Sequence, residues 1–389
     1  MIHRRICIVS HAGYRALTGG TSGHIGGVER QTSFLAKWLA ARGHSVDFVT
    51  WRHGAETEAM VDGVRMLTVC SEDEGIRGLR FVHPRWTSLV RALRYANADT
   101  YYHNTGEVVT GQVGLWCRTW RRRFVFSSAS HGDCDGALPF LPTRRERILY
   151  RIGLRCADAV IVQNETQRRL MQVNFGRASE VVAMPCPEPD LRDVLRPDEG
   201  PPSARVLWVG RLCPEKRAEL LIDVAKHAPD LQFDVVGPIE NAAYGEPIVA
   251  EIRRLANVTY HGRVVPSAMP ELYRRAVCLL CTSHLEGLPN TFLEAWSQGL
   301  PVVSTWDPDN VIRHRELGVA CASTPAAVAD AVRSLASSPD RWSRASSHAR
   351  TYYMAMHRPE LTFSAFERIL VGEETELVNV RNLRYLPRR

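Results

Sequence analysis

Two glutamates, Glu286 and Glu294, flank a Gly-Leu-Pro-Asn turn in the segment HLEGLPNTFLEAWSQGLPVVST, residues 284–305. The runs AVCLLCTS before it and PVVST within it predict a strand, a loop, a helix and a second strand. Open parallel sheets bind ligands in the loops at the carboxyl ends of their strands. Two carboxylates in such a loop need hydroxyl or cationic partners. The spacing therefore predicts that both hold one polar ligand; a helix cap and a solvated face are the structural alternative.

Two cations follow another predicted strand. The segment VGRLCPEKR, residues 209–217, places Arg211 and Lys216 in the loop after RVLWVG. An arginine fork and a lysine point charge together suit a diphosphate. Alone, the pair could be two solvated charges. With the amino end of the helix after Pro289 at the same sheet edge, the pattern predicts an anion site.

A glycine-rich loop, GGTSGHIGG, residues 19–27, follows the first predicted strand. It lacks the Gly-Lys-Ser/Thr ending of a P-loop, and its glycine spacing does not fit a dinucleotide fingerprint. Two interpretations remain open: a plain surface loop, or a loop whose amides approach a ligand, with Gly26 and Gly27 opening the helix.

The composition is that of a globular protein: 389 residues, 45% hydrophobic, 23% charged, with a net charge of +7. The basic surplus suits anionic partners. No apolar run reaches the roughly 18 residues of a membrane span, and ICIVS is too short for a signal-peptide core, so we expect a cytoplasmic protein. Ten cysteines show no repeated spacing, and Cys278 and Cys281 lack a second pair for a zinc site. We expect reduced thiols and no metal.

Strands alternate with helices twice along the chain, which predicts an α/β fold of parallel sheets covered on both faces. The first helix pattern places Leu35, Trp38 and Leu39 on one face and ends at Gly43. The pattern starts again near residue 205, after a proline-rich linker at 184–205. We expect a first domain at 1–190, a second domain at 200–355, and a helix and tail at 356–389 that pack back on the first domain.

These motifs together resemble the retaining glycosyltransferases of family 4, which have the GT-B architecture. The resemblance rests on the two glutamates with AWSQGLPVVST, on GRLCPEKR, on GGVERQTSFLAKWLAARGHSVDFVT and on ADAVIVQNETQRRL. It covers nearly the whole chain. The resemblance implies two doubly wound, Rossmann-like domains that face each other across a cleft. The domain at 1–190 would be the acceptor-side domain, and the domain at 200–355 would bind the nucleotide-sugar donor.

The resemblance also implies roles for single residues. Arg211 and Lys216 would neutralise the diphosphate of a nucleotide sugar, Glu294 would hold the ribose and Glu286 the sugar. The remaining donor-binding residues would be Gly262, Arg263, Val264, Gly287, Leu288, Asn290 and Thr291. The catalytic set would be His131, Glu286, Arg211 and Lys216. Fixed cations and a helix end would stabilise the leaving group, so no metal or cofactor is implied.

On the acceptor side, FVFSSASHGDCDG resembles the strand that ends in a cleft histidine in this family, which makes His131 a candidate. His103, Gly26 and Gly27 complete the acceptor-side set. Asp133 and Asp135 mimic a metal-binding Asp-x-Asp of another architecture, a match that we interpret as coincidence. Where many relatives have Ile-Pro-Asn-Gly, this chain reads AMPCPEP, residues 183–189, which puts the usual contribution of that loop in doubt.

Two arginine-rich segments, VGLWCRTWRRRF and LPTRRERILYRIGLR, interleave Trp116, Trp120, Leu149 and Tyr150 with basic residues. Such a face could bind an anionic membrane surface, or it could be an ordinary helix with a solvated basic side. The charge is not arranged as a nucleic-acid stripe. A cytoplasmic protein that is peripheral on the inner membrane face remains one hypothesis.

We therefore expect a retaining, metal-independent hexosyltransferase that uses a nucleotide-diphosphate sugar of the UDP or GDP type. Its acceptor would be a glycan, lipid-linked or small-molecule hydroxyl, in the synthesis of cell-surface polysaccharide or glycolipid. Two alternatives stay open: a non-hydrolysing sugar-nucleotide epimerase of the same architecture, and an inactive nucleotide- or glycan-binding protein.

Overall fold

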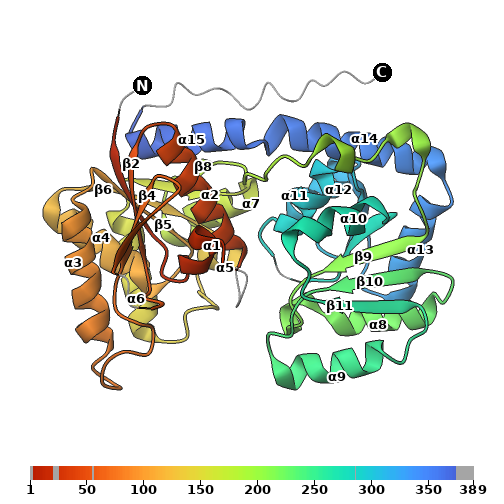
Figure 1. Cartoon of the computed structure of the whole chain (residues 1–389), viewed down its shortest axis with the longest axis horizontal. Helices are drawn as coiled ribbons and strands as arrows, with labels where there is room; N and C mark the ends of the chain where they lie inside the picture. The colour runs from red at the N-terminus through yellow and green to blue at the C-terminus, as the bar shows by residue number, and fades with distance from the viewer. Residues whose placement is uncertain (1–2, 21–25, 55–56, 285, 374–389) are drawn as a thin grey trace.

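The computed structural model describes residues 3–20, 26–54, 57–284 and 286–373. Two α/β halves lie side by side, each with a sheet between helices (Figure 1). The two sheets are separate, with eight strands in the first half and six in the second. The expected pair of doubly wound domains is confirmed.

The first sheet has the order β3-β4-β2-β1-β5-β6-β7-β8. All its neighbouring strands are parallel except β3, which runs antiparallel to β4 at the edge. Its strands are β1 Arg5–Val9, β2 Ser45–Thr50, β3 Glu58–Val61, β4 Val64–Thr68, β5 Thr100–Asn104, β6 Arg123–Ser127, β7 Ala159–Val162 and β8 Glu180–Val181. The chain order reverses between β1 and β5, which creates a crevice at their carboxyl ends.

The helices of this half are α1 Tyr14–Thr18, α2 Gly27–Ala41, η1 Phe81–Trp86, α3 Thr87–Ala96, α4 Val108–Trp120, α5 His131–Cys134, α6 Arg144–Cys156 and α7 Glu165–Phe175. The expected face of α2 is observed: Leu35 and Leu39 are buried, and Trp38 is partly buried. Gly43 adopts a φ of 89°, a backbone conformation that favours glycine, and so allows the chain to turn into β2.

The second sheet is parallel throughout, in the order β11-β10-β9-β12-β13-β14. Its strands are β9 Arg205–Val209, β10 Gln232–Val236, β11 Val258–Gly262, β12 Cys278–Cys281, β13 Val302–Ser304 and β14 Gly318–Ala320. Its helices are η4 Pro214–Lys216, α8 Ala218–His227, α9 Ala242–Ile252, η5 Pro266–Ala268, α10 Met269–Arg274, α11 Asn290–Ser297, η6 Pro308–Asn310, α12 Val311–Arg315 and α13 Pro325–Ala336. The order reverses between β9 and β12, so Arg211 and Glu286 follow adjacent strands.

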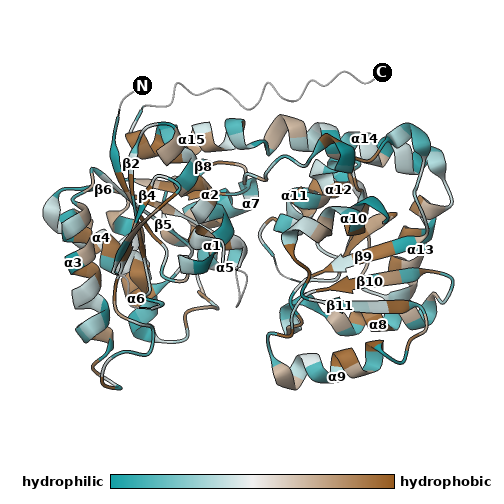
Figure 2. Cartoon of the chain, viewed as in Figure 1, coloured by the Kyte–Doolittle hydropathy of each residue, from teal (hydrophilic) through white to brown (hydrophobic). Residues whose placement is uncertain are grey.

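Both sheets have apolar strands between amphipathic helices, as the hydropathy colouring shows (Figure 2). β12 is buried along its whole length, so Cys278 and Cys281 are core residues. Among the described residues, no group of three or more potential metal ligands occurs. No described helix combines the length and the apolar character of a membrane span.

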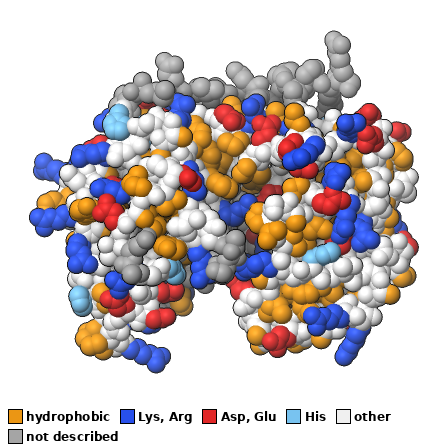
Figure 3. All heavy atoms as spheres, viewed as in Figure 1, with side chains coloured by type: hydrophobic (Ala, Val, Ile, Leu, Met, Phe, Trp, Pro, Cys, Tyr) orange, Lys and Arg blue, Asp and Glu red, His pale blue; other side chains and the backbone are white. Residues whose placement is uncertain are grey.

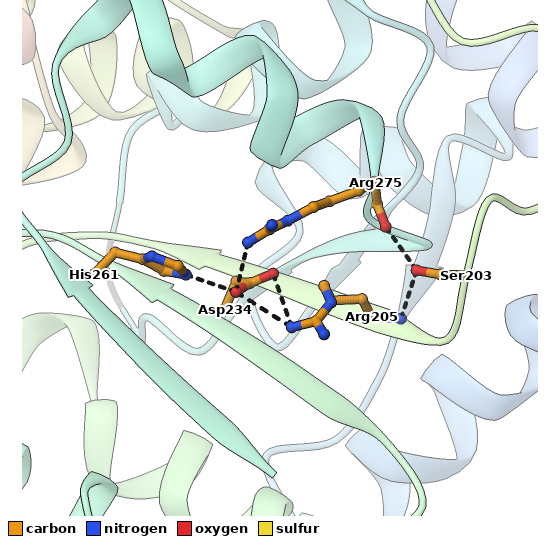
Figure 4. A network of polar contacts seen from close by, with 5 residues as sticks. All are labelled: Ser203, Arg205, Asp234, His261 and Arg275. Atoms are coloured by element: carbon orange, nitrogen blue, oxygen red, sulfur yellow. Dashed lines mark hydrogen bonds and ion pairs between the residues drawn. The ribbon is translucent and has the colours of Figure 1, made fainter.

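One buried charge stabilises the second sheet. Asp234 on β10 is 1% exposed, and its carboxylate accepts from His261 Nε2 at 2.6 Å and from Arg275 at 2.9 Å (Figure 4). Arg205 lies at 3.4 Å, and its amide donates to Ser203, whose hydroxyl donates to the Arg275 carbonyl. Three cationic or polar partners compensate the desolvation of one carboxylate.

The segment between the halves, which includes η2 Leu191–Asp193 and η3 Pro197–Glu199, is more ordered than a linker composition predicts. Met184 and Cys186 are buried in the core of the second half. The backbone amide of Cys186 donates to the His357 carbonyl at 3.0 Å, and Tyr353 donates to the Cys186 carbonyl at 2.9 Å. The proline-rich segment is thus held by α14, Pro339–Met356.

The chain returns to the first half at its end. α14 and α15, Pro359–Val371, run along one side of the molecule, from the second half to the first (Figure 1). Phe363, Phe366 and Leu370 of α15 join the buried cluster that contains β1 and α2 residues. The residues after 373 lie outside the described part, and so does the expectation for the tail.

The proposed apolar membrane anchors are wrong for three of the four residues. Trp116, Leu149 and Tyr150 are 7%, 8% and 0% exposed, because α4 and α6 pack against each other and against the first sheet. Only Trp120 is exposed. An amphipathic pattern shows that a helix has an apolar face, and here that face belongs to the core.

Candidate active site

A cavity of about 670 Å³ lies between the two halves. In Figure 3 the surface is hollowed where they meet, and Lys and Arg side chains gather beside the hollow. Its walls combine loops at the carboxyl ends of β5, β7, β9 and β12 with the amino ends of α2 and α11. We call this space the donor-side cavity. The predicted residues that line it are Gly26, Gly27, Arg211, Lys216, Arg263, Val264, Glu286, Gly287, Leu288, Asn290, Thr291 and Glu294.

Lys216 and Glu286 form an ion pair in the wall of this cavity. Their side chains are 22% and 18% exposed, so the pair is partly withdrawn from water. Arg211 pairs with Glu240, a more exposed carboxylate. Both predicted cations therefore form an ion pair with a carboxylate. A diphosphate would compete with these carboxylates and gain two charge-assisted contacts.

Glu294 lies on α11, one turn inside the helix. Its Oε1 accepts from Arg30 Nη1 at 2.9 Å, and its Oε2 accepts from the Tyr273 hydroxyl at 2.7 Å. Burial, with Glu294 as the next cause, raises the pKa of the Tyr273 phenol well above its usual value, so the phenol stays a donor. Arg30 belongs to α2 of the first half. Both carboxylate oxygens therefore have donors, one from each half.

His131 begins α5 and is 9% exposed. Its Nδ1 donates to the main-chain carbonyl of Glu286 at 2.7 Å, and its ring meets Trp306 edge-on at 5.6 Å. Burial lowers the pKa of His131, which the bond to Glu286 and the charge of Asp309 only partly offset. A neutral ring with the proton on Nδ1 follows. The imidazole lines neither large cavity and acts on the backbone of the Glu286 loop.

A second cavity of about 700 Å³ adjoins the first, and we call it the acceptor-side cavity. The two share Val28, Ala129, Arg211, Lys216, Glu286 and Gly287. Asp133 reaches this cavity, but its carboxylate accepts from the amides of Ala129 and Ser130, at 2.7 and 3.2 Å. It therefore serves in a capping box at the start of α5.

Two further predicted residues, besides His131, lie away from the cavity surfaces. His103 on β5 is 2% exposed, and its Nδ1 donates to the Val9 carbonyl at 2.9 Å, so this candidate is a buried sheet residue. Gly262 does not line the donor-side cavity. Its φ of 63° turns the chain, and Arg263 and Val264 follow at the cavity wall.

The divergent segment 183–189 forms part of the wall of the donor-side cavity. Met184, Cys186, Pro187, Glu188 and Pro189 line the donor-side cavity. Glu188 also pairs with Arg350 of α14 at 3.3 Å. The unusual sequence therefore changes one wall of the same cavity that contains Glu294.

Sequence reasoning missed most contacts between the halves. Gln31 donates to Asn290 Oδ1 at 2.6 Å, and Gln163 Oε1 accepts from the Leu288 amide at 3.3 Å. Asp309 accepts from the amides of Glu165 and Thr166, at 2.8 and 3.1 Å. The only available signal was position: Gln31 follows the glycine loop, and Gln163 follows a strand.

Two family models match the chain. The model described as "Glycosyl transferase 4-like domain" matches residues 26–187, and "Glycosyl transferases group 1" matches residues 203–338. The matches meet at the proline-rich segment and include most of the lining of both cavities. Among curated proteins, the sequence has no significant match.

Solved structures share the fold at low identity. Sucrose-phosphate synthase from Thermosynechococcus elongatus is 18% identical with a TM-score of 0.76, over 94% of this chain and 98% of that one. Anabaena HepE in complex with UDP-glucose is 18% identical, with a TM-score of 0.73, over 95% and 100%. WaaG, a glycosyltransferase involved in lipopolysaccharide biosynthesis, is 16% identical, with a TM-score of 0.67, over 94% and 100%.

The two sheets, the cavity at the carboxyl ends of their strands and the two adjacent family matches agree with one another. The chain belongs to the glycosyltransferases of GT-B architecture.

Proposed function

We propose that this protein is a retaining hexosyltransferase that takes its sugar from a UDP- or GDP-type nucleotide sugar. One observation carries the proposal: Arg211, Lys216, Glu286 and Glu294 all line one cavity together with the amino end of α11. These groups could bind the diphosphate, the ribose and the sugar of such a donor. The diphosphate would meet the two cations and the helix end, while the ribose and the sugar would meet one carboxylate each.

The chemistry follows from where charge develops. As the glycosidic bond breaks, negative charge grows on the leaving diphosphate, and fixed cations stabilise that state more than the ground state. The Lys216–Glu286 pair would open, which would release Lys216 to the phosphate and Glu286 to sugar hydroxyls. His131 would hold the backbone of Glu286 in place while the Glu286 side chain changes its partner. The acceptor hydroxyl would attack the anomeric carbon from the face that the diphosphate leaves and would pass its proton to the departing phosphate oxygen, so the anomeric configuration would be kept.

The adjoining acceptor-side cavity supports transfer over epimerisation. An epimerase needs no space for a second substrate, whereas here about 700 Å³ opens beside Glu286 and Gly287. The proposed reaction is metal-independent, because Arg211, Lys216 and the amino end of α11 would supply the positive charge for the leaving group.

The test is thermal stabilisation by UDP-, GDP- and ADP-sugars, for the wild type and Glu294→Ala. A ligand at one hundred times its Kd adds about 2.7 kcal/mol to the free energy of unfolding. We expect one nucleotide class to raise the Tm of the wild type and not of the variant. Glu251→Ala is the matched control, because Glu251 also pairs with a cation, Lys226, but lines neither cavity. If no sugar nucleotide raises the Tm, the proposal fails.

Retention is tested separately by NMR of the product anomer with the identified donor. A product with the inverted configuration would contradict this part of the proposal without affecting donor binding.

A further inference from the structure

The charge of the acceptor-side cavity is opposite to that of the whole chain. Six of its lining residues carry carboxyl groups: Glu107, Asp133, Glu146, Glu215, Glu240 and Glu286. Two carry cations, Arg211 and Lys216, and each already pairs with one of these carboxylates. Although the protein has a net charge of +7, this cavity has an acidic lining.

The donor would take the two cations. In the proposed function, on which this inference rests, Arg211 and Lys216 bind the diphosphate. The wall that the first half contributes then has three charged residues among those described, Glu107, Asp133 and Glu146. An acceptor with a phosphate or carboxylate at this wall would find no cation and would be repelled.

Glu107 is the exposed residue of these three, whereas Glu146 is half-buried and Asp133 is buried. It caps α4 through the Thr110 amide, and within the described residues it forms no ion pair. It is accessible to solvent through the cavity. Its carboxylate can therefore be reached by a positive group or by hydroxyl donors of a ligand in this cavity.

An unpartnered oxygen lies close by in the sequence. Asn104 ends β5, three residues before Glu107, and lines the donor-side cavity where Ala129 joins the two spaces. Asn104 is only 5% exposed, and its Oδ1 has no hydrogen-bond partner within the described part of the chain. A buried acceptor oxygen without a partner is costly, and a hydroxyl or ammonium donor would satisfy it.

We propose that the acceptor is a polyhydroxylated compound that carries an ammonium group and no anionic group next to the reacting hydroxyl, as in an amino sugar. Glu107 is its specificity-determining residue and binds the ammonium group. Asn104 Oδ1 accepts from a hydroxyl of the same molecule. Selection works by attraction at Glu107 and by repulsion of phosphorylated or carboxylated analogues.

The test compares three matched probes, glucosamine, glucose and glucose 6-phosphate. Their binding is measured by ligand-observed NMR with the nucleoside diphosphate saturating. We expect glucosamine to bind most tightly, then glucose, then glucose 6-phosphate. The step in affinity between glucosamine and glucose should be about tenfold, because the ammonium group adds a hydrogen bond between charged groups. Glu107→Gln, whose amide oxygen can still cap α4, should abolish that step. Glu251→Gln should leave it unchanged.

The outcomes separate the two proposals. If the nucleotide raises the Tm but glucosamine binds no better than glucose, or glucose 6-phosphate binds best, the acceptor inference is overturned and the donor site stands. If Glu107→Gln keeps the full preference for the amine while its nucleotide-dependent Tm shift shows that it is folded, Glu107 is not the determinant. Absence of any nucleotide shift would instead remove the proposed function itself.

Discussion

The Nδ1–H of His131 donates to the main-chain carbonyl of Glu286 at 2.7 Å, across 155 positions of sequence and from one half of the molecule to the other. We expect His131→Ala to lower kcat about tenfold or more with little change in nucleotide affinity, because the loop that carries Glu286 loses its fixed position. Steady-state kinetics with the identified donor measures this split. His131→Asn, which keeps a donor group, should recover part of the loss; an unchanged kcat in the alanine variant would contradict the positioning role.

Lys216 and Glu286 compensate each other's charge through their ion pair. Lys216→Met leaves Glu286 without its cation, so we expect the free energy of unfolding to fall by about 1–2 kcal/mol and nucleotide affinity to fall at least about tenfold. Urea denaturation and nucleotide titration give the two values. Lys226→Met removes a more exposed pair with Glu251 and should change both by much less. Equal effects in the two variants would show that the cavity lysine has no special role.

Gly27 at the start of α2 lies close to Asn290, the first residue of α11. A Cβ at this position would lie 2.1 Å from Asn290 Nδ2, so Gly27→Ala should displace the Asn290 side chain and break its 2.6 Å hydrogen bond with Gln31. We expect about 1 kcal/mol of destabilisation and weaker nucleotide binding. Gly20→Ala is the control, because its Cβ would meet nothing closer than 3.7 Å. A nucleotide affinity equal to that of the wild type would argue against a close approach there.

Asp309 connects the halves at a helix terminus. Its carboxylate accepts from the first two amides of α7, and its φ of 52° shows that the turn adopts a left-handed conformation to place it. A carboxylate at a helix amino end contributes about 1 kcal/mol, so Asp309→Ala should favour separation of the halves about fivefold. Small-angle scattering should show a larger radius of gyration. Asp340→Ala, in the first turn of α14, alters a helix end within one unit and should not.

Two buried histidines make stability depend on pH. Burial lowers the pKa of His103 and of His357 to about 4, although each donates to a backbone carbonyl. The unfolded chain takes up these protons near pH 6.5, whereas the folded chain does not. Stability is therefore retained above pH 6.5 and lost as the pH falls toward 4, by up to about 1.4 kcal/mol per pH unit for each histidine.

Urea denaturation between pH 7.5 and 5 measures this slope. His357→Asn, which can still donate to the Met184 carbonyl, should flatten it, and His53→Asn, at an exposed position, should not. An identical slope in the wild type and His357→Asn would mean that other groups dominate.

Local patterns in the sequence were enough to predict the alternation of strands and helices, the restart near residue 205 and the loops that carry Arg211, Lys216, Glu286 and Glu294. Hydrophobic periodicity and turn residues act within a few positions of the chain, so they can be read from one segment at a time. Parallel strands then bring loops from distant segments to one edge, which is why a motif at a strand end predicts a cavity residue.

The partners of those residues were decided only by the tertiary structure. Arg30 donates to Glu294 from 264 positions away, and Gln31 contacts Asn290 from 259. Such pairings depend on how the two halves face each other, which no local pattern encodes. The same reason explains the wrong membrane anchors: the periodicity around Trp116 and Tyr150 showed an apolar face but not what covers it. The sequence determined the elements and the chemical groups, and the packing of the halves decided which groups meet and which are buried.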